Sequence, residues 1–316
     1  MIFPTHNPYN YNMSAFQTLL FYKYAYLEDA ETFAAEHLRY CKTLGLKGRV
    51  LVGNEGINGS VSGMPEQCAT YMHHLSQDPR FEGIEFKIDD TDQLAFGKIH
   101  VRYRREIVHF GLDIDPRLAA TRLNAQEVLA LKDQPDVVMI DMRNNVEHRV
   151  GKFKNAVTLD LETFRDLPKH LPELEAYRNK RIIAYCTGGI RCEKATAYLI
   201  QQGFDRDKVF HIDGGIIKYA HQTGGTDFEG ECYVFDKRVV APVNTVNPSI
   251  ISQCRLCGTP STKMVNCANP ECNEHFVLCA ECGEKMQGTC STACYEHPRR
   301  RPYDGTGYYA RNGKQL

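Results

Sequence analysis

Hydrophobic positions in the first third of the chain alternate between strand-like runs and helix-like spacing. Apolar residues recur at helical spacing after Asp29 and again after Pro65, a residue that suits the first turn of a helix. The predicted strands are residues 16–22, 49–52, 60–62, 84–87 and 98–108, with a turn-rich segment at 53–59. This order predicts an α+β sandwich of the ferredoxin-like or acylphosphatase-like kind, bounded at residues 1–115.

The pattern changes in the middle third of the chain, which we bound at residues 121–228. Asn124 and Glu127 form a capping pair for a predicted helix at 125–131. Short β-rich runs follow at 137–140, 156–159, 181–185 and 209–212, with helical stretches between them. Such alternation predicts an α/β domain, in which a parallel sheet is covered by helices on both faces.

The composition indicates where in the cell the protein lies and what kind of surface could bind nucleic acid. None of the apolar runs in the 316 residues approaches the roughly 18 residues that a membrane span needs. The N-terminal residues lack the basic segment and apolar run of a secretory signal, so we expect a cytoplasmic protein without membrane contact. Because 38 basic side chains face 39 acidic ones, a nucleic-acid surface would have to be a local patch.

A glycine-rich loop joins the strand at 181–185 to a helical segment at 192–200. The loop consists of Cys186, Thr187, Gly188, Gly189, Ile190 and Arg191. Gly188 and Gly189 allow the backbone to turn its amides inward, and the following helix start adds positive potential. A cysteine at the start of such a loop has its thiolate favoured, and Arg191 strengthens the effect. The alternative is a buried structural cysteine at a strand end. Cys192 is expected to be secondary, either a resolving thiol or a small packed side chain.

Basic side chains gather in two places. Strand alternation puts four of them on one face, with a fifth beside them: Lys98, His100, Arg102, Arg104 and Arg105. Such a row could hold RNA phosphates, or it could be a solvated face paired with local acids. The tail mixes arginine with tyrosine at 299–303 and 308–311, which suits base stacking, although a disordered terminus has the same composition.

Eight cysteines crowd the C-terminal segment, bounded at residues 229–316. They are Cys254, Cys257, Cys267, Cys272, Cys279, Cys282, Cys290 and Cys294. Two CxxC pairs among them, in a reducing compartment, predict two tetrahedral zinc sites with a structural role. Spacing does not show which pairs share an ion. His275 and His297 are possible substitutes, and free thiols or disulfides are the alternative.

The loop at Cys186 resembles that of the rhodanese family, in which six residues from cysteine to arginine hold a persulfide sulfur. Other parts of the family pattern lie at 141–143, 147–148, 151, 155–156 and 212–215, so the resemblance covers residues 121–225. Cysteine phosphatases use a similar loop with one more residue, which argues against a phosphatase. We expect Asp141 and Arg143 to brace the fold.

The whole arrangement resembles the bacterial tRNA uridine hydroxylase family. The segments at 54–59 and 186–194 and the tail cysteines carry this resemblance. It implies 5-hydroxylation of the wobble uridine, residue 34, in the tRNA anticodon stem-loop. Molecular oxygen would be the co-substrate. The sequence displays no flavin or nicotinamide motif, and it identifies no protein partner.

Two other function classes fit the same residues. A thiosulfate or persulfide sulfurtransferase would use the ordinary chemistry of the rhodanese loop. A non-catalytic RNA-binding adaptor would rely on the cysteine-rich module and the basic strand, although the intact loop from Cys186 to Arg191 weighs against it.

Overall fold

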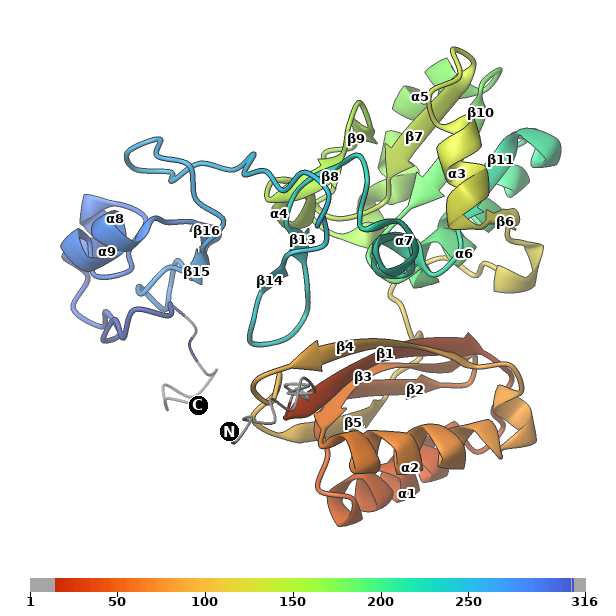
Figure 1. Ribbon diagram of the computed structural model, residues 1–316, viewed down its shortest axis with the longest axis horizontal. Coiled ribbons are helices and arrows are strands. Elements are labelled where there is room, and N and C mark those ends of the chain that lie inside the picture. The colour runs from red at the N-terminus through yellow and green to blue at the C-terminus, as the bar shows by residue number, and fades with distance from the viewer. Residues whose placement is uncertain (1–14, 308, 310–316) are drawn as a thin grey trace, which may run out of the picture. The chain divides into compact units, whose positions relative to one another are not determined.

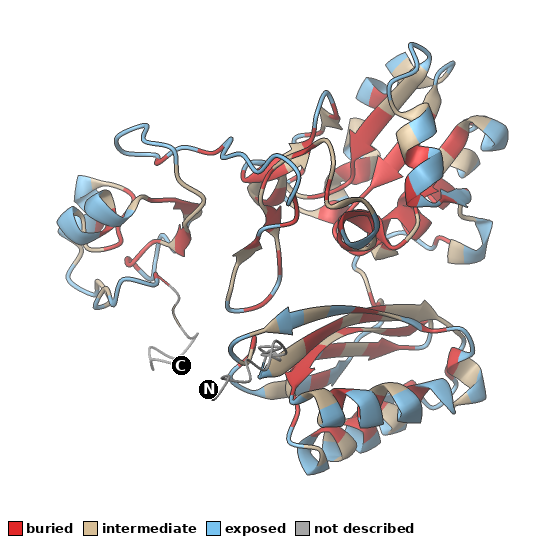
Figure 2. Cartoon of the chain, viewed as in Figure 1, coloured by how far each residue is buried: buried red, intermediate tan, exposed pale blue. Residues whose placement is uncertain are grey.

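The computed structural model describes residues 15–307 and 309. The chain forms two compact units, Met1–Arg105 and Glu106–Leu316, and each is described by itself. In both units the buried residues concentrate in the strands and on the helix faces that pack against them (Figure 2). None of the helices in the described residues is long and apolar enough to cross a membrane.

The N-terminal unit is a five-stranded sheet in the order β4-β1-β3-β2-β5. Its strands are β1 (Phe16–Tyr24), β2 (Lys47–Gly53), β3 (Gly56–Gly63), β4 (Glu85–Thr91) and β5 (Ile99–Tyr103). All neighbours are antiparallel except β2 and β5. The helices α1 (Ala30–Thr43) and α2 (Pro65–Ser76) cover one face of the sheet (Figure 1), and η1 (Pro79–Phe81) follows α2. This is the predicted acylphosphatase-like α+β architecture.

Two predicted segments of this unit are wrong in detail. Residues 56–59 belong to strand β3, which hydrogen-bonds along its length to β1 and β2, so the turn before it is shorter than predicted. The last strand ends at Tyr103 rather than at residue 108, and therefore Arg104 and Arg105 lie beyond it. The apolar residues 107 and 108 suggested a longer strand, but they belong to the following unit.

The C-terminal unit contains a second five-stranded sheet, in the order β6-β11-β10-β7-β9, and every pair is parallel. The strands are β6 (Thr121–Leu123), β7 (Val137–Asp141), β9 (Val157–Thr158), β10 (Arg181–Tyr185) and β11 (Val209–Ile212). The accompanying helices are α3 (Ala125–Leu131), α4 (Asn145–His148), α5 (Leu171–Leu174), α6 (Ile190–Gln201) and α7 (Gly215–Thr223). Short 3-10 helices are η2 (Pro116–Leu118), η3 (Phe164–His170), η4 (Glu175–Tyr177) and η5 (Arg206–Lys208). The predicted rhodanese-like parallel sheet is confirmed.

Helices cover both faces of this sheet, as the continuous apolar runs predict. Ile182 and Ala184 of β10 point into the core that α6 shares. On the opposite face Tyr185 packs edge-on against Phe153, which in turn packs against Tyr219 of α7. The capping box of α3 also forms as predicted, because the Asn124 side chain accepts hydrogen bonds from the first turn of α3.

The rest of the C-terminal unit consists of short hairpins and the cysteine-rich module. β8 (Gly151–Phe153) pairs with β12 (Phe228–Gly230), and β13 (Cys232–Tyr233) pairs with β14 (Val240–Ala241). The module itself contains β15 (Met264–Asn266), β16 (His275–Val277), α8 (Ala280–Lys285) and α9 (Thr292–Tyr295). With so little regular structure, its core consists largely of cysteines.

Candidate active site and cysteine-rich module

Cys186 follows the last residue of β10, and the loop after it is held from two sides. Gly189 adopts φ 99°, a left-handed conformation that turns its N–H toward Cys186, and this amide donates to Sγ at 3.2 Å. The first amides of α7 bind the loop from outside: Ile216 donates to the Cys186 carbonyl at 3.0 Å. A side chain at Gly215 would collide with that carbonyl, since a Cβ there would lie 2.4 Å from it.

The electrostatics of the loop favour the Cys186 thiolate. Burial alone would raise the pKa of this thiol, because its side chain is fully shielded from solvent. The hydrogen bond from the Cys192 thiol, the charge of Arg191 and the amides of Arg191 and Gly189 outweigh burial and lower the pKa from 9.0 to about 6. Cys192 serves as the donor in this pair, and burial together with this hydrogen bond raises the pKa of its own thiol.

Arg191 is clamped by a carboxylate that the sequence did not assign to the site. Its two terminal nitrogens donate to the two oxygens of Glu147, each at 2.6 Å, and both side chains are buried. Glu147 lies on α4, 44 residues before its partner. The charge of Arg191 is the main favourable influence on the Glu147 carboxyl, and the pKa of that carboxyl is lowered in spite of burial. The position of Glu147 within the rhodanese pattern was the only available signal.

Asp141 and Arg143 brace the fold, as predicted. The fully buried Arg143 guanidinium binds both oxygens of Asp141, at 2.9 Å and 2.6 Å, and it also donates to the Gly151 carbonyl at 2.6 Å. Asp141 ends β7, so this ion pair fixes the strand end next to β10.

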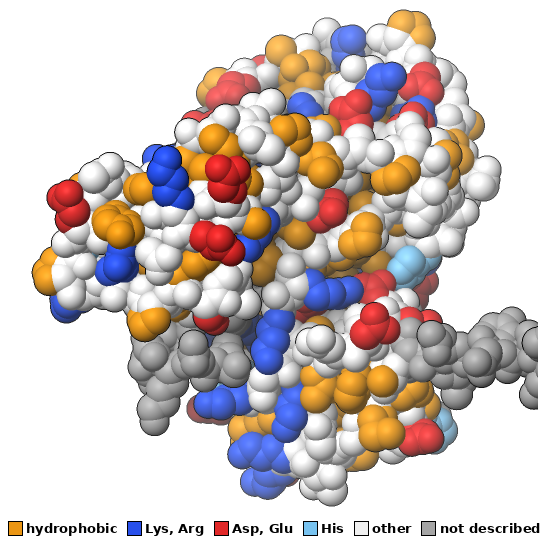
Figure 3. Space-filling view, turned by 60° about the vertical axis from the view of Figure 1, so that its left-hand side comes forward, with side chains coloured by type: hydrophobic (Ala, Val, Ile, Leu, Met, Phe, Trp, Pro, Cys, Tyr) orange, Lys and Arg blue, Asp and Glu red, His pale blue; other side chains and the backbone are white. Residues whose placement is uncertain are grey.

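The basic residues of the N-terminal unit lie on the outer edge of its sheet. Lys98, Arg102, Arg104 and Arg105 are all exposed, and within the described residues none of them is within 4.0 Å of a carboxylate. The parallel register places Arg49 of β2 beside His100. We call these six residues the basic strip. Figure 3 shows Lys and Arg side chains gathered on this unit, in the lower part of the view.

His100 differs from the other members of the basic strip. Partial burial, together with the positive charges of Arg102, Arg49 and Lys98, lowers the pKa of its imidazole below the ordinary 6.5. The lowered pKa favours the neutral form of the ring, so His100 adds less positive charge to the strip than an ordinary histidine would. The strand pattern alone could not reveal Arg49, because the pairing of β2 with β5 joins residues about 50 positions apart.

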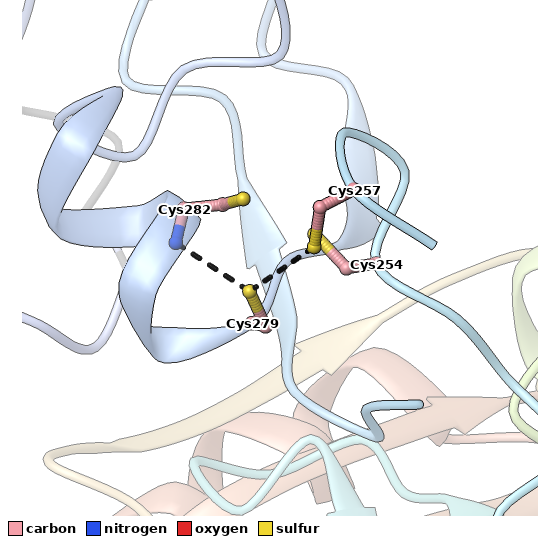
Figure 4. Close-up of side chains that lie close together, drawn as sticks. All are labelled: Cys254, Cys257, Cys279 and Cys282. Carbon is pink, nitrogen blue, oxygen red and sulfur yellow. Dashed lines mark hydrogen bonds between the residues drawn. The ribbon is translucent and has the colours of Figure 1, made fainter. Parts of the chain in front are cut away.

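The eight cysteines of the module form two sets of four. Cys254, Cys257, Cys279 and Cys282 make one set (Figure 4), and Cys267, Cys272, Cys290 and Cys294 make the other. The two sets are interleaved along the chain, because the first and third cysteine pairs share one site and the second and fourth share the other. His275 and His297 belong to neither set.

The sulfur positions fit tetrahedral metal binding. Zinc–sulfur bonds of about 2.3 Å place the sulfurs of a tetrahedral site about 3.8 Å apart. Cys257 and Cys279 are separated by 3.7 Å, Cys272 and Cys290 by 3.6 Å, and all ligand atoms within each set lie within 4.8 Å of one another. These distances are too long for disulfides, and all thirteen cysteines are free.

The arginine- and tyrosine-bearing segment at 299–303 packs on this module. Arg301 donates to the Ala268 carbonyl at 3.2 Å, and the ring of Tyr303 lies against Gly283 and Gly288. These two side chains are thus engaged within the fold. Of the second predicted stacking segment, residues 308, 310 and 311 lie outside the described residues.

Comparison with known proteins matches the three parts of the chain separately. The UPF0176 acylphosphatase-like domain matches residues 16–107, the rhodanese-like domain residues 124–222, and the rhodanese C-terminal family residues 229–295. A tRNA uridine(34) hydroxylase of Cytophaga hutchinsonii is 52% identical over 95% of this chain and 96% of its own length. The chain belongs to the tRNA uridine(34) hydroxylase family.

Two further members of this family are less similar to this chain. The Bacillus pumilus tRNA uridine(34) hydroxylase is 44% identical over 79% of each chain. The Staphylococcus saprophyticus enzyme is also 44% identical, over 79% of this chain and 80% of its own. The family resemblance inferred from the loop at Cys186 and the tail cysteines is therefore confirmed.

Proposed function

We propose that this protein hydroxylates C5 of uridine 34 in tRNA, in the cytoplasm, with Cys186 as the catalytic nucleophile. The observation that carries the proposal is the likeness, over 95% of the chain, to a tRNA uridine(34) hydroxylase. The lowered pKa of Cys186 supports the role of this residue, because a thiolate is the reactive form of cysteine.

The proposed role of Cys186 is to make C5 of the uracil ring nucleophilic. The thiolate adds to C6, a C6–S bond forms, and the electron pair of the C5–C6 double bond moves onto the C4 carbonyl oxygen as an enolate. Once oxygen has been placed on C5, loss of the C5 proton expels the thiolate and restores the double bond. The Gly189 amide and the Cys192 thiol hold the sulfur in place throughout.

The overall reaction consumes molecular oxygen and two electrons. Uridine, O₂ and two thiols give 5-hydroxyuridine, water and a disulfide, so a cellular thiol is the class of reductant that we propose. Arg191 does not donate electrons in this scheme. Held by Glu147, it supplies positive potential beside the sulfur.

We propose that the basic strip binds the tRNA backbone. Among the described residues, Lys98, Arg102, Arg104 and Arg105 have no carboxylate within 4.0 Å, so these four side chains offer phosphates a charged row without first breaking ion pairs. The members of the strip are Arg49, Lys98, His100, Arg102, Arg104 and Arg105. We further propose that the strip and Cys186 engage the same anticodon stem-loop, because a single-stranded loop allows a base to turn outward toward a buried thiolate.

We also propose that each four-cysteine set holds one structural zinc ion. Four thiolates satisfy the tetrahedral preference of zinc and leave no position open for a substrate. The zinc ions would stabilise a module whose small core consists largely of cysteines. Two measurements test this proposal: the zinc content of freshly purified protein, and its thermal stability with and without a chelator.

Mass spectrometry of tRNA tests the proposed function directly. Cells lacking the protein should contain no 5-hydroxyuridine-derived nucleoside at position 34, and the wild-type gene should restore it. Cys186→Ser should not restore it, whereas Cys192→Ala should restore most of it. Normal hydroxyuridine in cells that contain only Cys186→Ser would contradict the catalytic role of Cys186.

A sulfurtransferase activity is the second candidate, favoured by the loop that holds Cys186 as a thiolate. The thiolate would attack the outer sulfur of thiosulfate, form a cysteine persulfide and release sulfite. Transfer of that sulfur to cyanide would give thiocyanate. Thiocyanate formation by wild-type protein, lost in Cys186→Ser and accompanied by unaltered tRNA in deletion cells, would favour this function over hydroxylation.

A further inference from the structure

A short hairpin tip connects β13 to β14, and its conformation is tightly specified. We call Val234–Val239 the hairpin tip. The Val234 amide donates to the Val239 carbonyl at 2.8 Å, and the Asp236 carboxylate accepts from the Arg238 amide at 2.9 Å and from its guanidinium. Val239 adopts φ 63°, which a β-branched residue rarely does and which costs about 1–3 kcal/mol. Such a conformation persists only where surrounding contacts enforce it.

The cysteine-rich module supplies those contacts. Tyr233 and Val239 pack against the apolar cluster of Val150, Met264 and Val277, of which the last two belong to β15 and β16. The Tyr233 hydroxyl also lies 3.3 Å from Nε2 of His275 on β16. The module therefore fixes the base of the hairpin tip.

The tip carries an exposed aromatic ring against the loop of Cys186. Phe235 is 54% exposed, and its ring centroid lies 5.9 Å from Cζ of Arg191. The loop itself is shielded, since Cys186 is 0% exposed and Arg191 only 7%. In the described part of the C-terminal unit, Tyr295 is the other exposed large aromatic side chain, and the Arg300 guanidinium lies over its ring at 4.3 Å.

The tip also carries an available cation. Lys237 is exposed, and across residues 15–307 and 309 its ammonium group has no carboxylate within 4.0 Å. Arg191 cannot serve the same purpose, because Glu147 occupies both of its terminal nitrogens. An exposed ring and a free lysine two residues apart are the pair of groups with which proteins bind single-stranded nucleic acid.

We infer that the hairpin tip binds single-stranded RNA beside the catalytic loop, with the ring of Phe235 stacked on a base and Lys237 against an adjoining phosphate. The inference rests on the proposed function and deepens it by naming side chains that would hold the anticodon loop next to Cys186. The shielded loop cannot hold a nucleotide by its own exposed groups, so an external platform is required.

Fluorescence of a labelled anticodon stem-loop tests this inference on the full-length protein. The probe is an RNA hairpin with uridine at position 34 and 2-aminopurine at position 35, whose emission is quenched when the base stacks. Phe235→Ala should abolish the quenching and weaken the Kd about tenfold, which corresponds to about 1.4 kcal/mol and lies within the range for one base–aromatic stack. Phe235→Tyr should bind within about twofold of wild type.

Lys237→Ala has a different signature. It should retain the quenching but lower the slope of log Kd against log salt concentration by about 0.7, the value for one phosphate contact to a single strand. Val246→Ala is the matched control, because Val246 is an apolar side chain of the same unit that is 61% exposed. It should leave both the quenching and the Kd unchanged.

Phe235→Leu distinguishes stacking of the ring on a base from apolar packing of the side chain within the protein, because leucine keeps apolar contact but has no ring. If this variant matches Phe235→Ala in binding while its melting temperature and the Cys186 thiolate absorbance stay at wild-type values, the stacking role is supported. If Phe235→Leu or Phe235→Ala binds the probe as tightly as wild type, with full quenching, the inference is overturned.

Failure of the proposed hydroxylase function can be distinguished from failure of the inference about the hairpin tip. Unaltered hydroxyuridine in cells lacking the protein would remove the hydroxylase activity, whereas the fluorescence measurement would still show whether the hairpin tip binds single-stranded RNA. Conversely, normal hydroxyuridine in cells that contain only Phe235→Ala, together with an unchanged Kd, would remove the role of the tip and leave the activity intact.

Discussion

The ionisation of Cys186 is the property of the site that a titration can measure most directly. With a pKa of about 6 in place of 9.0, the sulfur should be roughly 90% thiolate at pH 7, against about 1% for an ordinary thiol. Thiolate absorbs near 240 nm, so the difference in absorbance between wild type and Cys186→Ser isolates this residue from the other cysteines. The metal-loaded protein should be used, because bound cysteines do not titrate.

The same shift links pH to stability. Since the folded-state pKa of Cys186 lies below the unfolded value, its ionisation stabilises the fold fully above about pH 9, and this contribution is lost as pH falls toward 6. A shift of this size corresponds to about 4 kcal/mol. Urea unfolding of wild type and Cys186→Ser should therefore give free energies whose difference changes by about 1.4 kcal/mol per pH unit between pH 6 and 9.

Cys192→Ala tests which groups lower the pKa of Cys186. This variant removes the S–H donor that helps to hold the thiolate, so the absorbance midpoint of Cys186 should move to higher pH. A wild-type midpoint near the ordinary value of 9.0 would refute the reasoning. An unchanged midpoint in Cys192→Ala would show instead that Arg191 and the backbone amides suffice.

Three further predictions follow from ion pairs, metal ligands and surface charge. Glu147→Gln should lower the unfolding free energy by about 3 kcal/mol in urea melts, because it leaves a buried arginine unpaired; Glu175→Gln, which breaks a similar but solvent-exposed pair, should cost less than about 1 kcal/mol. Cys254→Ser should lower the zinc content measured with a chromogenic chelator, and retention of two ions would contradict the assigned ligand set. Arg102→Ala combined with Arg104→Ala should weaken tRNA binding and reduce its salt slope while sparing thiosulfate chemistry; unchanged affinity would exclude the basic strip as the tRNA surface.

The loop from Cys186 to Arg191 could be predicted because the residues that identify it lie close together in the sequence. An apolar strand, two glycines, an arginine and a helix start occur together within about a dozen residues, and each has a direct physical effect on the sulfur of Cys186. The parallel sheet was predictable for a similar reason, since strands covered on both faces have continuous apolar runs. Those runs at β7, β10 and β11 correspond closely to the strands in the structure.

What could not be predicted depends on pairing across long separations in sequence. Nothing near Glu147 indicates that its carboxylate binds an arginine 44 residues later, and nothing near Arg49 indicates that it lies beside β5. Cysteine spacing likewise leaves several partitions of the eight ligands open. Phe235 has an ordinary sequence context, so only its exposure and its contact with Arg191 set it apart.

The interleaved cysteine sets also have a consequence for how the protein is made. On the ribosome, Cys254 and Cys257 emerge first, yet their partners Cys279 and Cys282 follow only after the first pair of the other set. The 22 residues from Cys257 to Cys279 take about 1–4 seconds to synthesise. During that interval the nascent chain carries up to four uncommitted thiols, open to oxidation or to capture of an ion by the wrong four ligands. Loading of the two proposed zinc ions in the cell should therefore depend on metal supply and thiol redox state during translation.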